Sequence, residues 1–309
     1  MSWVIAIPAW GDRCIPLLRG SAIPSVQAAL KYAGNPPARF VIHTDEPGRL
    51  ADIAATHKCE IRRLPQVRHS RYYTLSDCHR EAIEYAKPGE FVALINADHV
   101  VSREIFMASE RVLHAGKRLV MMCGTRTLQS DVMPQPIIGV SSRELLSWAW
   151  DNRHPTMEDA IWGTGKSTSL SMLYFVNQTQ SEVISRCFHL HPFAFVKQPE
   201  LKFKGLTVDE DLADAWPKEL IHVVTKADEA ALIEQSPPDF RFKSHTKRFG
   251  IRDIAFWANG DNGRGGSRAT ELHRWLFTKR IVIRGHGANV GDRAVCEAIL
   301  SVIPDVRAA

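Results

Sequence analysis

Residues 75–103 constrain the fold of this chain more than any other stretch, because they combine a helix, a turn and a buried strand. Apolar and small residues recur at helical spacing over residues 75–86, so one face of that helix can pack on a sheet. Lys-Pro-Gly at residues 87–89 ends the helix. Residues 91–95 are an uninterrupted apolar run, which is typical of a strand covered on both faces.

The apolar run is followed at once by four mostly polar residues, Asn96, Ala97, Asp98 and His99. Open α/β sheets bind their ligands in the crevice outside the carboxyl ends of parallel strands. An acid directly after a buried strand lies in that region. Asp98 is therefore a candidate functional residue, and its alternative role is to cap the helix that follows.

The N-terminal third alternates strands with helices. Strands are predicted at residues 3–8, 39–43, 59–64 and 91–95, and helices at residues 25–33, 50–56 and 75–86. This alternation favours an α/β fold, a three-layer α/β/α sandwich with a mostly parallel central sheet and right-handed crossovers. Residues 9–13 are expected to form a loop.

Later elements are less regular. Strands are expected near residues 118–123, 172–176, 188–196 and 220–225, and helices at 104–114, 141–150, 181–186, after residue 225, at 268–278 and at 291–302. Residues 151–168 are polar and contain glycine, which favours a loop or flap.

Charge is distributed unevenly. Between residues 241 and 284 there are eleven Lys and Arg against three Asp and Glu, a balance of +8 in a chain whose total is +5, so the remainder sums to −3. With Pro237 and Pro238 as a boundary, we expect a catalytic domain at residues 1–236 and a basic, mainly helical extension at 237–309. Lys247 and Arg248 in this extension are candidates to contact an anionic ligand.

Apolar runs are far shorter than the roughly 18 residues of a membrane span, and the N-terminus has no basic signal-peptide region. We therefore expect a cytoplasmic protein. The six cysteines are scattered without a C-x-x-C pair, which favours isolated reduced thiols.

Two nucleotide-binding motifs are incomplete. Gly165-Lys166 follows the spacing of a P-loop only if residue 160 is glycine, and it is Ala160. The dinucleotide fingerprint requires G-x-G-x-x-G after the first strand, which residues 8–12 do not supply.

Three features follow one another in the N-terminal part: a first strand with a loop after it, a second strand followed by the acid Asp45, and a Gly-Glu pair before an apolar strand that is followed by the acid Asp98. This order resembles the nucleotide-binding half of GT-A glycosyltransferases of the family-2-like class. The resemblance covers about residues 2–106 and implies a nucleotide-sugar donor and a hydroxyl acceptor, which would be a glycan, a lipid-linked molecule or a small molecule. It implies that Pro8, Trp10, Asp45 and Asn96 contact the nucleotide. Asn96 stands where the family's D-x-D motif has its first acid.

The resemblance also implies a divalent metal, Mn²⁺ or Mg²⁺, on the donor diphosphate, because a hard cation neutralises the charge of that leaving group. Asp98 is the carried-over ligand, and His99 is a weaker one. His189 and His191 would lie on one face of a strand and are further candidate ligands; their alternative is a solvent-facing pair.

Asp209 and Asp211 belong to a second cluster of acids, which is either an exposed turn or the source of a catalytic base. An inverting transferase needs a carboxylate that deprotonates the acceptor hydroxyl, and we rank Asp211 first. The main hypothesis is a metal-assisted glycosyltransferase. The alternatives are a nucleotidyltransferase that activates a sugar phosphate and a non-catalytic nucleotide-binding protein. Contact with a membrane surface stays open, and nucleic acid is disfavoured because the basic segment has no recognised motif.

Overall fold

The computed structural model describes residues 1–57, 59–65, 68, 70–129, 137–163, 171–203, 207–240, 250–258 and 269–303. Its central feature is a seven-stranded sheet with the order β11-β6-β10-β4-β1-β2-β3. In chain order these strands are β1 (Trp3–Pro8), β2 (Ala38–Thr44), β3 (Cys59–Arg63), β4 (Phe91–Leu94), β6 (Leu119–Met122), β10 (His191–Val196) and β11 (Ile221–Val223).

Neighbouring strands of this sheet are parallel except at β10, which runs antiparallel to β4 and β6. The α/β class with a mainly parallel central sheet is therefore confirmed. β1 and β4 are buried along their whole length, as their continuous apolar runs predicted.

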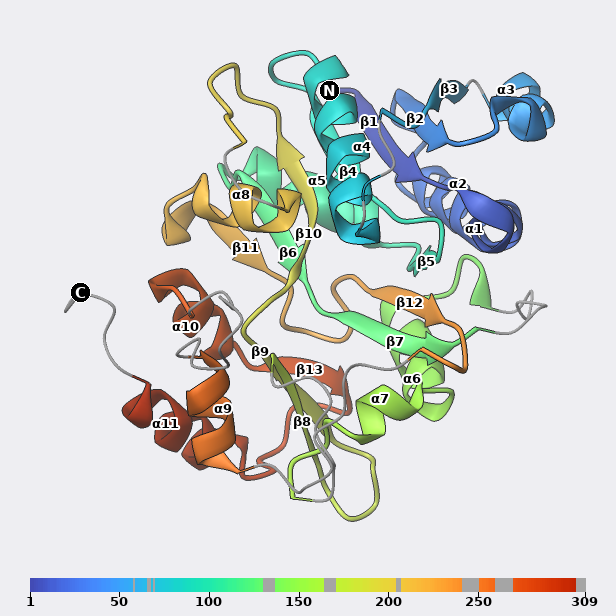
Figure 1. Ribbon diagram of the computed structural model, residues 1–309. Coiled ribbons are helices and arrows are strands. Elements are labelled where there is room, and N and C mark those ends of the chain that lie inside the picture. Colours follow the sequence, from blue (N-terminus) through green and yellow to red (C-terminus); the bar gives the residue numbers. More distant parts are fainter. Residues whose placement is uncertain are drawn as a thin grey trace.

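Two three-stranded sheets lie beside the large sheet (Figure 1). One contains β5 (His99–Val101), β12 (Leu232–Ser236) and β7 (Gly124–Leu128), and the other contains β13 (Ile281–Arg284), β9 (Val183–Cys187) and β8 (Met172–Val176). Because β7 continues the chain from β6, and β10 follows β9, both small sheets are tied to the middle of the large one.

Helices cover both faces of the central sheet and also pack on the two small sheets. In the first part of the chain they are α1 (Gly11–Leu17), the π-helical η1 (Leu18–Ala22), α2 (Ile23–Tyr32), η2 (Pro47–Leu50), α3 (Ala51–His57), α4 (Arg71–Tyr85) and α5 (Ile105–His114). They are followed by α6 (Ser142–Asp151), α7 (Pro155–Glu158), α8 (Val208–Asp214), η4 (Lys218–Leu220), α9 (Ile251–Ala258), α10 (Glu271–Phe277) and α11 (Asp292–Val302).

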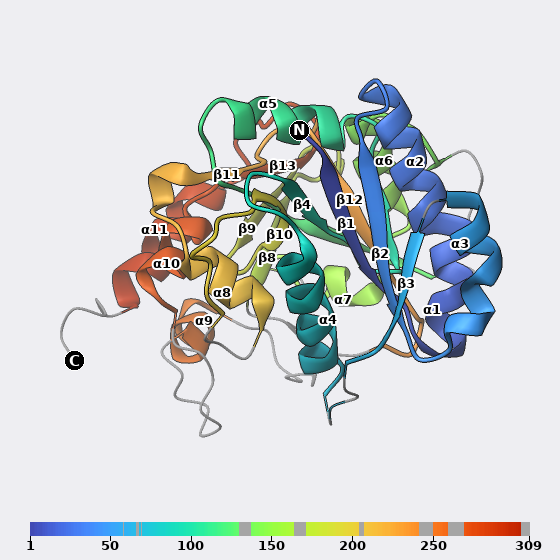
Figure 2. The same cartoon turned by 90° about the horizontal axis from the view of Figure 1, so that it is seen from above.

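The alternating side chains of β1 show the layers. Trp3, Ile5 and Ile7 pack in a core with residues of α2, α3 and α5, whereas Val4 and Ala6 pack in a second core with α4 and α8. Figure 2 shows α4 and α8 on one face of the sheet and α2 and α5 on the other. The three-layer arrangement follows from a sheet whose strands are apolar on both faces.

Four local predictions were wrong. The helix expected at 181–186 is strand β9, whose five buried residues pair with β8, and the helix expected after residue 225 contains strand β12, which pairs with β5 and β7. The loop at 9–13 contains the start of α1, and the loop at 151–168 contains the short α7. Strand pairing and helix docking overrode local propensity at these places.

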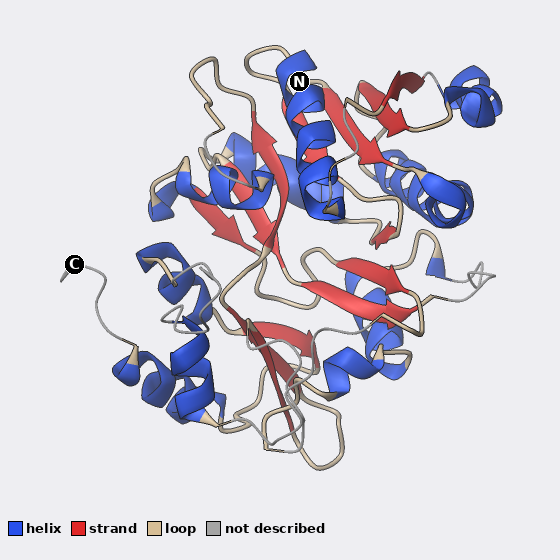
Figure 3. Cartoon of the chain, in the orientation of Figure 1, coloured by secondary structure: helices blue, strands red, loops and turns tan. Residues whose placement is uncertain are grey.

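The chain after residue 237 is packed against the preceding part. β13 pairs with β9, and the buried Arg186 of β9 donates hydrogen bonds from Nε at 3.0 Å and from Nη2 at 2.5 Å to Asp292 of α11. Figure 3 shows strands in the middle of the molecule and helices around them. The division at residue 237 stays a prediction.

The six cysteines are free thiols, as predicted. Two of them are not isolated, however, because Cys123 Sγ lies 3.8 Å from Cys187 Sγ. In the part of the chain that the structure describes, no helix has the length and apolar character needed to cross a bilayer.

Candidate active site

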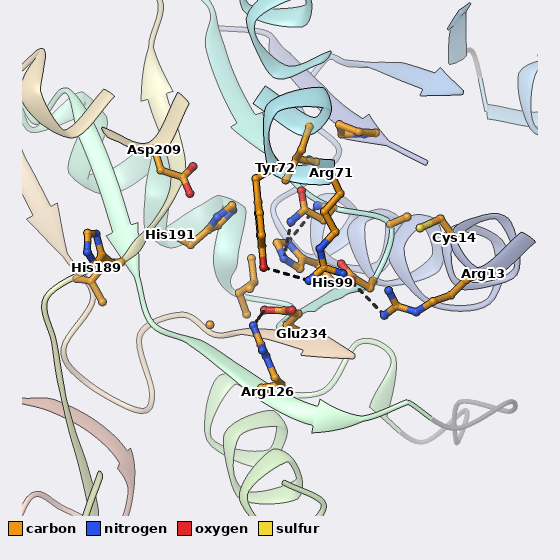
Figure 4. A pocket seen from close by; sticks show the side chains of 18 of the residues that line it. Arg13, Cys14, Arg71, Tyr72, His99, Arg126, His189, His191, Asp209 and Glu234 are labelled. Carbon is orange, nitrogen blue, oxygen red and sulfur yellow. Dashed lines mark hydrogen bonds and ion pairs between the residues drawn. The ribbon is translucent and has the colours of Figure 1, made fainter. Parts of the chain in front are cut away.

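A cavity of about 470 Å³ opens at the carboxyl ends of β1 and β4. Its wall combines the β1–α1 loop, the first turn of α4, the turn after β4, and strands β7 and β12 (Figure 4). Cavities of this size accommodate a small ligand. The position is the one that the end of β4 predicted.

The turn after β4 presents Asp98 to this cavity. His99 donates its backbone N–H to the carbonyl of Asn96 at 3.0 Å, which closes the turn, and Gln235 of β12 donates its N–H to the Asp98 carbonyl at 2.8 Å. The backbone of Asp98 is thus fixed from both sides, and its carboxylate is a positioned group.

Asp98 shares the cavity wall with a second acid, Glu234 of β12. Each acid is matched with an arginine: Arg13 Nη2 lies 3.3 Å from Asp98 Oδ2, and Arg126 Nη2 lies 2.9 Å from Glu234 Oε2. Burial, and then the charge of Glu234, raise the pKa of Asp98 to about 6 from 3.8. Asp98 can therefore exchange a proton near neutral pH.

Aromatic and basic groups complete this end of the cavity. α4 begins at Arg71, four residues before the apolar periodicity predicted, and its first turn carries Arg71 and Tyr72 into the wall. The Arg71 guanidinium lies 5.0 Å from the Tyr72 ring centroid. Pro8 and Trp10, predicted to contact the nucleotide, also line the cavity. The aromatic rings of Tyr72 and Trp10 are suited to stacking on a base or a sugar.

His99 is buried and neutral. Asn96 donates its backbone N–H to His99 Nδ1 at 3.1 Å, so the ring proton resides on Nε2. The side-chain amide of Asn96 lies 3.2 Å from Nε2, and the amide oxygen is the group that can accept the Nε2 proton. Burial, and then His191 and His79, lower the pKa of His99 well below its usual range. Both ring nitrogens are thus engaged with Asn96. The Asn96 side chain has a structural partner at the position where the resemblance implies contact with the nucleotide.

His189 and His191 point to different partners. His191 Nε2 lies 2.9 Å from the carbonyl oxygen of Leu94, and its ring packs edge-on against His99 with centroids 5.0 Å apart. His189 precedes β10 and packs on His273, with centroids 4.3 Å apart. The two do not share one face of a strand, because the chain turns between β9 and β10 and only His191 belongs to a strand.

Asp209 and Asp211 lie on helix α8 and not on an extended segment. Residues two apart on a helix point about 200° apart. Asp209 is exposed and lines the cavity, where Figure 4 shows its carboxylate directed toward the His191 ring. Asp211 is buried and lies 3.3 Å from Arg80 Nη2. The geometry reverses the ranking of the two acids as candidates for the catalytic base.

Asp45, the acid after β2, bonds to the protein backbone. Its carboxylate accepts the N–H of Gly11 with oxygens at 3.1 and 3.3 Å, at the first residue of α1. Gly11 has φ +71°, a left-handed conformation that favours glycine. Asp45 therefore anchors the helix that carries Arg13. Lys247 and Arg248 lie outside the described residues.

The predicted metal ligands do not gather into one coordination set. Asp98 is paired with Arg13, His99 with Asn96, His191 with a carbonyl and His189 with His273. Within the described ranges, no group of three or more His, Cys, Asp or Glu side chains is placed to hold a metal ion. Among the described residues, the predicted donor set therefore does not fit the hard-cation site that the resemblance implied, which needs converging carboxylate oxygens.

Sequence reasoning missed Arg13, Arg71, Arg126 and Glu234. Arg71-Tyr72-Tyr73 before the α4 stripe was a usable signal, because basic and aromatic residues at a helix start are suited to binding anions. Arg126 and Glu234 had no such signal, since they meet only because β7 and β12 pair in register, with Arg126 opposite Glu234.

Comparison with known proteins gives weak similarity only. No protein-family model and no curated protein sequence matches the chain. Among solved structures, that of S. aureus TarS residues 1–349 aligns with a TM-score of 0.38 and 10% sequence identity, over 90% of this chain and 70% of that chain. A second TarS structure aligns with a TM-score of 0.36 and 10% sequence identity, over 89% of this chain and 42% of that chain. A Bacillus anthracis protein assigned as a glucose-1-phosphate thymidylyltransferase, in complex with a sucrose, aligns with a TM-score of 0.29 and 12% sequence identity. The alignment covers 42% of this chain and 56% of that chain.

Proposed function

We propose that this chain is a glycosyltransferase that moves a sugar from a nucleotide-diphosphate donor to a hydroxyl acceptor. One observation carries the proposal: two carboxylates, Asp98 and Glu234, and their arginine partners line a cavity at the carboxyl ends of parallel strands. Open α/β sheets bind ligands there. The guanidiniums suit a diphosphate, and the carboxylates suit sugar hydroxyls.

The opposite wall supplies a base. Asp209 is an exposed carboxylate beside His191, and the contact of His191 Nε2 with the Leu94 carbonyl fixes that ring. In the proposed step Asp209 takes the proton of the acceptor hydroxyl while the oxygen of that hydroxyl attacks the anomeric carbon of the donor sugar. The bond from that carbon to the diphosphate oxygen breaks, and its electron pair leaves with the diphosphate.

Several parts of the hypothesis stay predictions. They are the divalent metal, the contacts of Lys247 and Arg248, the cytoplasmic location and the kind of acceptor. The proposed step includes no metal ion, because the predicted ligands among the described residues do not converge. Trp10 and Tyr72 are the proposed stacking groups for the base or the sugar of the donor.

The test is release of nucleoside diphosphate from a panel of UDP-, GDP-, CDP-, ADP- and dTDP-sugars, with calorimetric titration of each donor in parallel. Binding of one donor and slow hydrolysis or transfer support the proposal. Release of pyrophosphate from a nucleoside triphosphate and a sugar phosphate would instead indicate a nucleotidyltransferase. Binding with no turnover for any acceptor would indicate a non-catalytic nucleotide-binding protein.

A further inference from the structure

Three arginines converge on one end of the cavity. Arg13 donates from Nε to Gln129 at 2.7 Å and from Nη2 to the Gln235 carbonyl at 2.7 Å, in addition to its pairing with Asp98. These three contacts hold the guanidinium in one orientation. Arg126 is fixed by Glu234, and Arg71 lies against the rings of Tyr72 and Phe240.

The charges at this end favour an anion. Three guanidiniums face two carboxylates, Asp98 and Glu234, so the cluster has an excess of positive charge when both acids are ionised. Arg13 and Arg126 are largely sheltered, with side-chain exposed fractions of 30% and 17%, whereas Arg71 is exposed at the mouth of the cavity. Charge interactions are stronger in such a site than at an open surface.

Guanidinium geometry adds specificity. A planar fork of N–H donors matches two oxygens of a phosphate group, which a lysine ammonium does not. The Asp98 and Glu234 carboxylates offer the same kind of oxygen pair, so they hold the arginines in place in the absence of ligand. A diphosphate can take over these donors without a large rearrangement of the side chains.

We infer that Arg13, Arg71 and Arg126 bind the diphosphate of the donor and neutralise its charge in place of a divalent metal ion. The inference rests on the glycosyl transfer proposed above. It explains why the four predicted metal ligands have other partners and why an asparagine stands at residue 96. The leaving diphosphate would then accumulate its negative charge against fixed guanidiniums.

The experiment measures binding of inorganic pyrophosphate and of UDP, GDP, CDP, ADP and dTDP to metal-stripped protein by calorimetry, in excess EDTA and again with Mn²⁺. We expect equal affinity in both conditions. Arg13→Ala and Arg126→Ala should each weaken binding roughly 10- to 100-fold, since charged hydrogen bonds are lost. Arg13→Lys should recover only part of the loss.

The matched control is Arg19→Ala, because Arg19 lies in η1, directly after α1, and pairs with Asp52 outside the cavity. Thermal unfolding of every variant excludes a folding defect. Binding only with Mn²⁺, abolished by Asp98→Asn, overturns the inference and leaves the proposed function standing. Metal-free binding of pyrophosphate but of no nucleotide supports the arginine site and rejects the proposed function. Binding of no probe in either condition rejects both.

Discussion

Arg13 on α1 and Asp98 after β4 form an ion pair with Nη2 and Oδ2 3.3 Å apart, although 85 residues separate them in the chain. The contact joins the carboxyl ends of two adjacent parallel strands, because α1 follows β1 and the Asp98 turn follows β4. It places a titrating acid at the middle of the proposed donor site.

Replacing Asp98 with asparagine should change the pH dependence of stability. The folded protein holds the Asp98 proton more tightly than the unfolded chain, because burial and Glu234 raise the pKa from 3.8 to about 6. The contribution of Asp98 to stability should therefore be greatest below about pH 4 and be lost as pH rises through 6, by at most about 3 kcal/mol. Urea unfolding of both proteins across this range isolates the effect. An identical pH slope in Asp98→Asn would contradict it.

Asp209→Asn and Asp211→Asn form a matched pair on α8. Asp209 is exposed at the cavity, so its replacement should leave stability nearly unchanged and lower turnover roughly 10²- to 10⁴-fold. Asp211 is buried against Arg80, so its replacement should cost roughly 1–3 kcal/mol and leave turnover within a few-fold. Steady-state kinetics and unfolding curves check both. The opposite pattern would restore Asp211 as the base.

Asp45→Ala should destabilise the protein by about 1 kcal/mol, because the Gly11 N–H at the start of α1 loses its acceptor. Asp45→Asn keeps an acceptor oxygen and should recover most of this loss. Guanidinium unfolding gives the comparison. If Asp45 instead contacts the nucleoside, Asp45→Ala will weaken donor binding while the unfolding curve stays at its wild-type position.

Asp292→Asn should be far more destabilising, by roughly 3–5 kcal/mol, because it leaves the buried Arg186 without its counter-charge. Asp52→Asn is the control, since the Asp52–Arg19 pair is exposed and should contribute less than about 1 kcal/mol. Thermal denaturation distinguishes the two. A small effect at Asp292 would mean that α11 is not held to β9 by this ion pair.

Cys14 offers a reporter for the cavity, and Cys59 on β3 is its internal control. Both cysteines are half-buried, and of the two only Cys14 lines the cavity. Burial and the charge of Asp98 raise the pKa of the Cys14 thiol, and burial raises the pKa of the Cys59 thiol to about 11. At a ligand concentration about ten times Kd, maleimide labelling of Cys14 should slow about tenfold, because only unliganded protein reacts. Peptide mass spectrometry measures each site. Equal slowing at Cys59 would indicate global protection.

Periodicity and apolar runs predicted the parallel part of the sheet, since β1 and β4 are apolar on both faces and leave little choice of structure. The same signals failed at β9 and β12. β9 lies between β8 and the remote β13, and both partners of β12, β5 and β7, are more than 100 residues earlier in the chain, so local propensity contains little information on these pairings.

The candidate site divides in the same way. The sequence by itself determined that an acid, Asp98, follows a buried strand and faces the ligand crevice, because strand length and the turn at residues 96–99 fix its position. Only the tertiary structure decided which groups meet it. Helix docking brings Arg13 to Asp98, and strand register places Glu234 with its partner Arg126 in the same cavity wall. Tertiary packing likewise gives Asp45 and Asp211 structural partners, the Gly11 N–H and Arg80. Side-chain charge is encoded locally, but its partner depends on the packing of distant elements.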